Sequence, residues 1–320
     1  MRQFLSANDV SDVDELIQKA LQYKAHPLKD QPLGKAKRLG LIFLNPSLRT
    51  RISTQIAAEN LGMSSMVFNV GSEGWQWEFE EGAFMNGQTV EHIKDAAPVL
   101  GQYFDMLAFR SFPSLTDKTK DYSEFAMQQL VKYSGLPVLS LESATLHPLQ
   151  SLADLITIAE TKSIQKKPKV VLTWAPHIKA IPQCVANSFA QWVHKWGESD
   201  FVITHPQGYE LDEQFSQGAT IEYNQDKALE GADYVYIKNW SSYNDYGKVL
   251  SNDDTWMMNK KKWGITNEAK IMHCLPVRRN VEVSDEMLDF EHSLVTRQAG
   301  NRVWAAQAVI AEMLQSMNSR

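Results

Sequence analysis

Short apolar runs alternate with longer amphipathic segments along the first half of this 320-residue chain. Four of these runs have the composition of β-strands: 39–44, 65–70, 106–110 and 137–141. Helical patterns such as 90–103 and 121–133 separate them. Strands that are joined through helices pair in parallel, so this order predicts an α/β fold built on a parallel sheet.

The second half repeats the arrangement after a long helical pattern at 149–161. Five further runs read as strands: 169–174, 200–204, 219–223, 233–238 and 270–274. A chain of this length exceeds one ordinary core, so we expect two α/β domains, 1–148 and 149–300. A strand-like run at 293–296 precedes a final helical pattern, and we expect the C-terminal helix 301–320 to pack back on the first domain.

The charge balance and the cysteine content exclude several classes of protein. A formal net charge of −6 gives no basic excess for nucleic acid or acidic lipid. The two cysteines suit a reducing compartment, and no window approaches 18 uninterrupted apolar residues. We therefore expect a cytoplasmic protein with no disulfide, no nucleic-acid partner and no membrane partner.

The segment Ser47-Leu48-Arg49-Thr50-Arg51 directly follows the first predicted strand. It reads as a turn and the first turn of a helix, where free backbone N–H groups and the helix dipole favour an anion. Two hydroxyls and two guanidinium groups add donors and fixed positive charge. The segment predicts a phosphate site, although an ordinary capped surface helix could carry the same residues.

Polar residues also follow most of the other predicted strands, and in parallel sheets ligands bind beyond the carboxyl ends of strands. Arg110 ends the third strand, and His147-Pro-Leu-Gln150 follows the fourth. In the second half, His177, Lys238 and the segment 273–279 take corresponding places. We therefore expect these residues to form a binding site at one edge of each sheet.

Three of these motifs, in this order, resemble those of the aspartate/ornithine carbamoyltransferases. They are Ser47-Leu-Arg-Thr-Arg51, His147-Pro-Leu-Gln150 and His273-Cys-Leu-Pro276. Further segments resemble the branch of the family that acts on N-acylated ornithines: Trp75, 85–92, 173–177, Asn187-Ser188, 238–240 and 275–280. The motifs extend over most of the chain, so the resemblance is far more specific than any one of them.

The resemblance implies transfer of the carbamoyl group of carbamoyl phosphate to an amine, with phosphate leaving. Arg49, Thr50, Arg110 and His147 match the catalytic positions. The positions that match carbamoyl phosphate contacts are Ser47, Leu48, Arg49, Thr50, Trp75, Arg110, His147, Gln150, Cys274, Leu275 and Arg302. Among these, Gln150 and the backbone at 274–275 would take the carbamoyl NH₂. The positions assigned to an acyl-ornithine are Glu142, His177, Lys238, Arg278, Val90 and Lys179.

The family also implies a carbamoyl phosphate domain followed by an acceptor domain with a knotted backbone. It further implies a homotrimer in which Trp75 and the loop through residue 92 reach a neighbouring subunit's site. No metal and no cofactor are expected. Read without the resemblance, Trp75 beside Gln76-Trp77-Glu78 would be a half-buried packing cluster.

The acceptor is expected to be an N-acylated ornithine in arginine biosynthesis. No Ser-Met-Gly element for a free α-amino group accompanies Lys238, and a cation there favours an acceptor whose α-amino group is masked. At position 90 the succinyl enzymes carry proline and the acetyl enzymes glutamate, whereas this chain has Val90. Valine does not repel a succinyl carboxylate, and Lys179 could bind it unless it is simply a solvated charge. N-Succinylornithine is thus preferred, with N-acetylornithine as the alternative.

Two other functions compete with this prediction. A nucleotide-binding oxidoreductase would carry Gly-x-Gly-x-x-Gly after a strand, and neither the strand ending at Leu44 nor the one ending at Trp174 is followed by it. A non-catalytic carbamoyltransferase-like binding protein would have lost charged groups from the phosphate loop. Arg49, Arg110 and His147 are all present, which favours catalysis.

Overall fold

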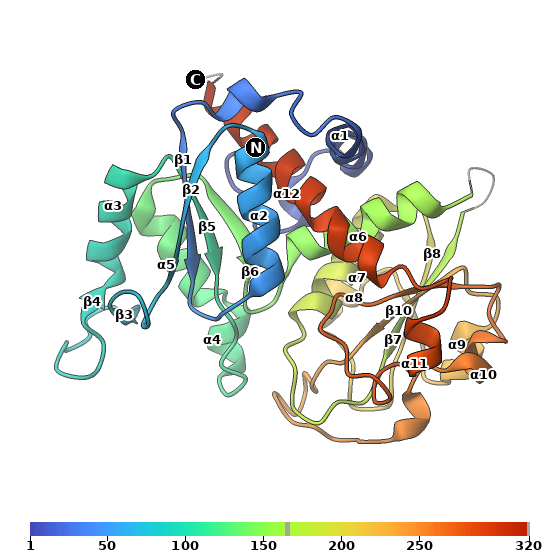
Figure 1. Cartoon of the computed structure of the whole chain (residues 1–320). Helices are drawn as coiled ribbons and strands as arrows, with labels where there is room; N and C mark the ends of the chain where they lie inside the picture. Colours follow the sequence, from blue (N-terminus) through green and yellow to red (C-terminus); the bar gives the residue numbers. More distant parts are fainter. Residues whose placement is uncertain (164–166, 319–320) are drawn as a thin grey trace. The chain divides into compact units, whose positions relative to one another are not determined.

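A computed structural model describes residues 1–163 and 167–318 and divides the chain into two compact units (Figure 1). Unit 1 comprises Met1–Ser114, Thr119–Leu149 and the C-terminal segment from Arg302. Unit 2 comprises Leu115–Lys118 and Gln150–Asn301. Each unit has its own parallel sheet, and this confirms the predicted fold class.

The main sheet of unit 1 has four parallel strands in the order β2-β1-β5-β6. They are β1 (Arg38–Phe43), β2 (Ser64–Asn69), β5 (Met106–Arg110) and β6 (Val138–Glu142). Strands β1, β5 and β6 are buried along nearly their whole length, which explains why they read as continuous apolar runs rather than as alternating patterns. Strand β2 lies at an edge and remains partly exposed.

Helices surround this sheet (Figure 1). The elements are α1 (Val13–Ala25), α2 (Leu48–Asn60), α3 (Ile93–Tyr103), α4 (Lys118–Tyr122), α5 (Phe125–Ser134), two short strands β3 (Trp77–Glu78) and β4 (Glu91–His92), and two 3-10 turns η1 (Ala7–Asp9) and η2 (Gln31–Gly34). The single helical pattern expected at 121–133 is broken between α4 and α5. Glu124 adopts a left-handed conformation there (φ 54°), which a continuous helix cannot include.

The sheet of unit 2 has five parallel strands in the order β11-β10-β7-β8-β9. They are β7 (Lys169–Trp174), β8 (Asp200–Thr204), β9 (Thr220–Glu222), β10 (Tyr234–Lys238) and β11 (Lys270–Met272). The helical elements are α6 (Pro148–Thr161), α7 (Cys184–Trp196), α8 (Glu213–Ser216), α9 (Gln225–Leu229), η3 (Asp254–Trp256), α10 (Lys260–Trp263) and α11 (Asp285–Leu288).

The prediction of a strand at 293–296 was wrong. Ser293 forms only an isolated bridge with Ile271, and α12 (Val295–Asn318) already begins at Val295. The β-branched Val295 and Thr296 favour strands, but here they form the first turn of a 24-residue helix. From Arg302 onward this helix belongs to unit 1.

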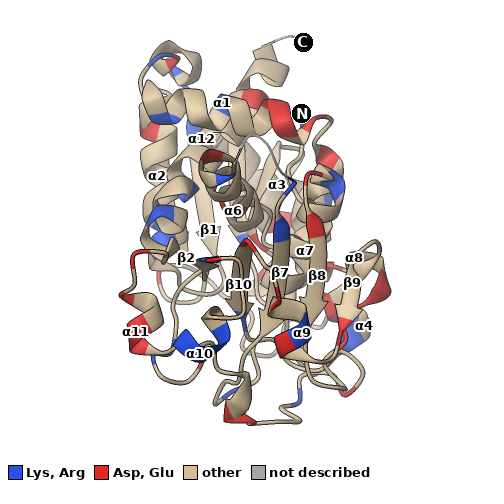
Figure 2. Ribbon diagram, turned by 90° about the vertical axis from the view of Figure 1, so that its right-hand side faces the viewer, with Lys and Arg blue, Asp and Glu red and all other residues tan. Residues whose placement is uncertain are grey.

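Basic and acidic residues are interspersed on the face that Figure 2 shows, for example over α9, α10 and α11. This mixture agrees with the small formal net charge of −6. Within residues 1–163 and 167–318, no helix combines the length and the apolar content that crossing a membrane requires.

Candidate active site

The first site segment lies between β1 and α2 in unit 1. Ser47 occupies the N-cap position with an extended backbone, but its hydroxyl does not cap the helix. Arg49, in the first turn, is half-buried, and its Nε finds no hydrogen-bond partner among the described residues. Leu48 and Arg51 point to solvent. The start of this 13-residue helix thus presents an uncapped hydroxyl, backbone N–H groups and a guanidinium, which suit an anion.

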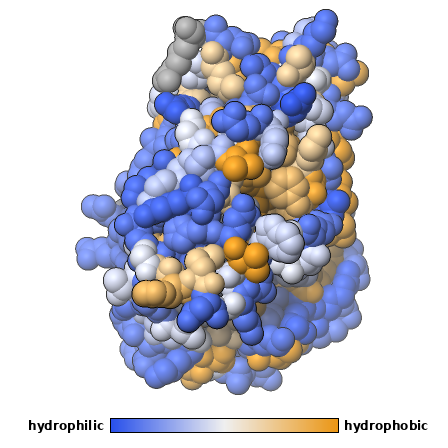
Figure 3. All heavy atoms as spheres, turned by 90° about the vertical axis from the view of Figure 1, so that its left-hand side faces the viewer, coloured by the Kyte–Doolittle hydropathy of each residue, from blue (hydrophilic) through white to orange (hydrophobic). Residues whose placement is uncertain are grey.

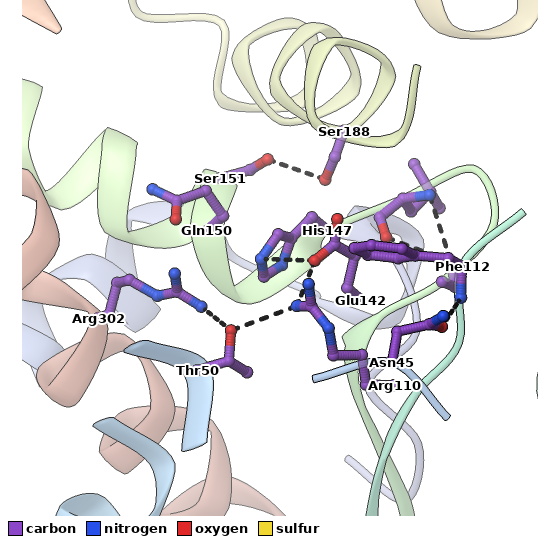
Figure 4. Close-up of polar contacts among 12 residues, drawn as sticks. Asn45, Thr50, Arg110, Phe112, Glu142, His147, Gln150, Ser151, Ser188 and Arg302 are labelled. Atoms are coloured by element: carbon purple, nitrogen blue, oxygen red, sulfur yellow. Dashed lines mark hydrogen bonds and ion pairs between the residues drawn. The ribbon is translucent and has the colours of Figure 1, made fainter. Parts of the chain in front are cut away.

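Thr50 lies one residue further along α2 and is 1% exposed. Its Oγ1 accepts a hydrogen bond from Arg302 Nη2, and Arg110 Nη1 lies 3.5 Å from the same oxygen (Figure 4). Arg302 belongs to α12 and Arg110 ends β5, so three distant segments of unit 1 meet at one hydroxyl. The two guanidinium groups create a strongly positive environment beside the start of α2.

Arg110 also forms an ion pair with Glu142, the last residue of β6. The pairing of β5 with β6 is irregular: Phe109 lies opposite Ser140, whereas Arg110 lies opposite Glu142. The skipped residue places both charged side chains on the same face of the sheet, because side chains alternate along a strand. The ring of Phe112 covers the guanidinium, with 4.5 Å between Arg110 Cζ and the ring centroid.

His147 follows β6 and starts the segment that leads into α6. Its Nε2 lies 3.4 Å from Glu142 Oε2, and the side chain is 5% exposed. Burial lowers the pKa of His147 well below its usual range, and the charges of Arg302 and Arg110 lower it further. The ring is therefore neutral, and its contact with Glu142 is a hydrogen-bonding contact rather than a full ion pair.

A partly buried glutamate that the sequence analysis missed holds the turn before His147. Glu124 accepts hydrogen bonds from Ser143 Oγ at 2.7 Å and from Thr145 N at 2.8 Å. Burial raises the pKa of Glu124, and the hydrogen bonds from Thr145 and Ser143 oppose this effect. No local pattern predicts this role, because the donors are about 20 residues away in the sequence.

Unit 2 presents its own residues at the carboxyl end of β11. His273 is buried, and its Nδ1 accepts a hydrogen bond from Leu275 N at 2.9 Å. Leu275 has a left-handed backbone (φ 56°) and precedes Pro276 through a cis peptide bond. Cys274, which lies between His273 and Leu275 in the chain, is buried and is not in a disulfide. Gln150, near the start of α6, is 1% exposed and donates from Nε2 to Asp154 Oδ1.

His177, Arg278 and Lys238 also belong to unit 2. Arg278 Nε donates to His177 Nε2 at 2.9 Å, and Lys238 Nζ donates to Asn239 O at 2.9 Å. Burial lowers the pKa of His177, while a backbone hydrogen bond with Lys179 and the charge of Glu282 act in the opposite direction. The ring is thus a neutral acceptor for the guanidinium.

Glu282 is a second residue that the sequence analysis missed. Its Oε2 accepts from Arg278 N at 2.8 Å, and its Oε1 lies 3.3 Å from His273 Nε2. Burial acts to raise its pKa, but the hydrogen bond and charge of His273 and the charge of Lys238 outweigh burial and bring the pKa to about 2. This carboxylate therefore stays ionised and ties His273 to the Arg278 backbone.

Three predicted residues have side chains that are largely exposed. Trp75 and Val90 are 64% and 61% exposed and lie in or near the β3–β4 segment, and Leu48 is 70% exposed. Lys179 is exposed, although its backbone O accepts a hydrogen bond from His177 Nδ1 at 3.0 Å. Among the described residues, no group of three or more His, Cys, Asp or Glu is arranged to hold a metal ion.

Two family models match the chain. The one described as "Aspartate/ornithine carbamoyltransferase, carbamoyl-P binding domain" matches residues 2–160. The one described as "Aspartate/ornithine carbamoyltransferase, Asp/Orn binding domain" matches residues 182–313.

Curated relatives match over the full length. An N-succinylornithine carbamoyltransferase of Bacteroides thetaiotaomicron is 46% identical over 319 residues, which covers 99% of this chain and 100% of the relative. An N-acetylornithine carbamoyltransferase of Xanthomonas campestris is 32% identical, with 98% of each chain covered.

Solved structures of N-acetyl-L-ornithine transcarbamylase are also similar. One is a variant in which a glutamate is replaced by valine, complexed with carbamyl phosphate and N-succinyl-L-norvaline. It superposes with a TM-score of 0.90 at 32% identity and covers 98% of this chain and 100% of that one. A complex with acetylcitrulline has a TM-score of 0.90 at 31% identity and covers 98% and 99%.

The neutral state of His147 predicts a pH dependence of stability. Below about pH 6.5, the ordinary pKa of histidine, the unfolded chain binds a proton at position 147 that the folded protein does not bind. The contribution of His147 is therefore complete above this pH and falls as the pH falls, by at most about 1.4 kcal/mol per pH unit. Denaturant unfolding of the wild type and of His147→Gln should give free energies whose difference shrinks below this pH. Parallel pH profiles would contradict the assignment of a neutral ring.

Proposed function

This chain belongs to the aspartate/ornithine carbamoyltransferase family, and from this premise we propose that it carbamoylates the δ-amino group of N2-succinyl-L-ornithine. The reaction would consume carbamoyl phosphate and give N-succinyl-L-citrulline and phosphate, as a step of arginine biosynthesis. The observation that carries the proposal is the buried cluster of Thr50, Arg110 and His147, joined by Arg302, beside the start of α2.

The chemistry requires two charges to be stabilised. When the amine attacks the carbamoyl carbon, negative charge develops on the carbonyl oxygen, and a phosphate anion leaves as the C–O bond breaks. Ser47, Arg49 and the N–H groups of α2 would bind the phosphate. Thr50, Arg110 and His147 would polarise the carbonyl oxygen. A neutral His147 has a single ring N–H, which would donate to this oxygen when the substrate replaces Glu142 as the acceptor, and the ring carries no charge that would attract the phosphate away from its loop.

The charges of unit 1 support a catalytic protein over a non-catalytic binding protein. Three guanidinium groups, those of Arg49, Arg110 and Arg302, accompany one carboxylate, that of Glu142. Buried or half-buried cations in this excess are costly unless an anion joins them. A carbamoyl phosphate dianion would balance them, and Glu142 would remain available to orient the δ-amine.

The second unit would bind the acceptor, in agreement with the Asp/Orn description of its family model. Lys238 and Arg278 provide cations for the carboxylates of an acyl-ornithine, and His177 holds Arg278 in place. Glu282 is engaged with His273 and with the backbone of Arg278. This arrangement favours an acceptor whose α-amino group is masked.

Position 90 supports the succinyl group over the acetyl group. Val90 is uncharged and exposed, so it offers no repulsion to the additional carboxylate of a succinyl group. A similar structure holds carbamyl phosphate and N-succinyl-L-norvaline when valine replaces a glutamate. Lys179 is exposed beside His177 and could pair with the distal carboxylate.

We also propose the homotrimer with shared sites that the family resemblance implies. Leu48, Ile52 and Ile56 recur every four residues on α2 and are 70%, 47% and 39% exposed. Met66 on the edge strand β2 is 53% exposed. An exposed apolar stripe on one helix, with an edge strand that is also apolar, is typical of a surface that a second subunit covers.

The β3–β4 segment is a candidate for the part that reaches a neighbour. Trp75 precedes β3, and the segment exposes Phe84, Met85 and Val90. Figure 3 shows the face that carries α3, β3 and β4, where apolar groups in orange interrupt a largely hydrophilic surface. These residues are unexplained in a single subunit, and contact with a second subunit's substrate would account for them.

The function is tested by assaying purified protein with carbamoyl phosphate and, separately, N-succinyl-, N-acetyl- and unmodified L-ornithine. We expect the highest kcat/KM with the succinyl compound and a citrulline product of the corresponding mass. Arg110→Ala serves as the inactive control, because its loss removes a donor to the carbonyl oxygen, which costs about 100-fold or more. A preference for unmodified ornithine would overturn the argument from Lys238, and no product with any acceptor would overturn the proposal.

A Val90→Glu variant tests the charge argument at position 90. The new carboxylate should repel the distal carboxylate of a succinyl group, so kcat/KM should fall by about tenfold or more for N-succinylornithine. N-Acetylornithine lacks that carboxylate and should lose much less. Val90→Gln is the matched control, since glutamine has nearly the same size as glutamate but no charge. An equal loss on both acceptors would refute the argument.

Shared sites are tested with two inactive variants, Arg49→Ala and Trp75→Ala. If one subunit supplies Arg49 and its neighbour supplies Trp75, every mixed trimer contains one complete site. Co-expression should therefore restore roughly a third of the wild-type activity per mixed trimer. The control is co-expression of Arg49→Ala with Arg110→Ala. Both residues belong to the same subunit's part of the site, so this pair should recover no activity. Mixed trimers identified by mass but without restored activity would exclude sharing.

A further inference from the structure

A buried carboxylate on α6 lies one helical turn after Gln150. Asp154 is 0% exposed, and its Oδ1 accepts hydrogen bonds from two amides: Gln150 Nε2 at 2.8 Å and Gln298 Nε2 at 2.7 Å. All three residues belong to unit 2. Gln150 and Gln298 are themselves 1% and 0% exposed, so the network is closed to water.

The carboxylate of Asp154 fixes the orientation of the Gln150 amide. A carboxylate oxygen can only accept a hydrogen bond, whereas an amide has an NH₂ donor at one end and an oxygen acceptor at the other. The NH₂ of Gln150 must therefore face Asp154, and its Oε1 must point away. This Oε1 is buried and has no hydrogen-bond partner within the described part of the chain. A buried acceptor of this kind is rare in folded proteins and indicates a donor supplied from outside.

The same carboxylate is linked to the second group expected to contact the carbamoyl NH₂. Gln298 Oε1 accepts from His273 N at 2.9 Å, and His273 Nδ1 accepts from Leu275 N at 2.9 Å. Asp154 thus connects Gln150 with the backbone at residues 273–275. Tyr236 also faces this carboxylate: burial raises its pKa, and the charge of Asp154 raises it further, so the phenol keeps its proton.

We propose that Asp154 is a positioning residue that fixes Gln150 Oε1 as the acceptor for the NH₂ of carbamoyl phosphate. The inference rests on the proposed function. A Gln150 amide turned the other way would set its own NH₂ against the NH₂ of the substrate, and two donors do not pair. Asp154 therefore gives the protein its discrimination against acyl phosphates of the same shape that lack this NH₂.

Acetyl phosphate is the probe, because a methyl group replaces the NH₂ and the rest of the molecule is unchanged in shape. We expect Asp154→Leu, which keeps the side-chain volume without an acceptor, to lower kcat/KM for carbamoyl phosphate about tenfold or more. The inhibition constants of acetyl phosphate and of inorganic phosphate should change less than about twofold, since neither ligand uses Gln150. Equal weakening of all three ligands would indicate only a general structural role and would overturn the proposal.

Conservative and matched variants complete the test. Asp154→Asn can keep an oxygen facing both amides, so it should retain most of the discrimination; a loss as large as in Asp154→Leu would overturn the orientation argument. Ser151→Ala changes the residue that follows Gln150 on α6 and removes a buried hydrogen bond with Ser188 on α7 (2.8 Å). It leaves the hydrogen bond between Gln150 and Asp154 in place and should leave the ratio unchanged. Should Asp154→Leu fail to fold by circular dichroism, Asp154→Ser takes its place, because water can fill the space while the amide is released.

Gln150→Met separates failure of the inference from failure of the proposed function. Loss of discrimination in Gln150→Met but not in the Asp154 variants would refute the positioning role alone. Unchanged discrimination in both would refute the assignment of Gln150 to the carbamoyl NH₂. A wild-type protein without carbamoyl transfer to any ornithine would refute the function itself.

Discussion

The irregular register between β5 and β6 is the constraint on which the arrangement of unit 1 depends. With regular pairing Arg110 would lie opposite Leu141, and Glu142 would point to the other face of the sheet. The skipped residue brings the two charges together, and removing either partner would leave the other as a buried charge without its counter-charge in this pair. Thr50 and His147 then contact this pair from α2 and from the start of α6. The cluster is thus held by the sheet, which explains how cationic groups remain buried before any substrate is bound.

The sequence was most informative where local pattern and sheet topology agree. The apolar runs identified the main strands, and parallel pairing implied that the residues after them would meet at one edge. This reasoning predicted that the segment with Thr50, the strand-end Arg110 and His147 would lie at one edge, because each lies within a few residues of a strand end. In the structure Arg110 lies beside Thr50, and His147 lies beside Glu142. The family was also identified correctly, since its motifs are short continuous segments whose order survives without knowledge of the fold.

The supporting residues could not be found in this way. Glu124, Asp154 and Glu282 are single carboxylates with no motif around them, and their importance comes from donors that only the folded chain brings near. The strand prediction for Val295 and Thr296 failed for a related reason, because tertiary packing extended α12 across residues whose own preference is for a strand. Local preferences amount to a few tenths of a kcal/mol per residue, and burial of a long amphipathic helix outweighs them.

Charged and neutral groups have separate tasks in this protein. Guanidinium groups such as those of Arg49, Arg110 and Arg302 attract any phosphate-like anion, and long-range attraction distinguishes poorly between carbamoyl phosphate and its analogues. Recognition of one substrate requires groups whose hydrogen-bonding direction is fixed. A neutral His147 can donate where a carbonyl oxygen becomes negative, and an oriented Gln150 can accept only from an NH₂. Because an amide can turn over at little cost in water, its direction carries information only when a buried partner such as Asp154 holds it. The buried carboxylates therefore contribute to specificity although they bear the same sign of charge as the substrates.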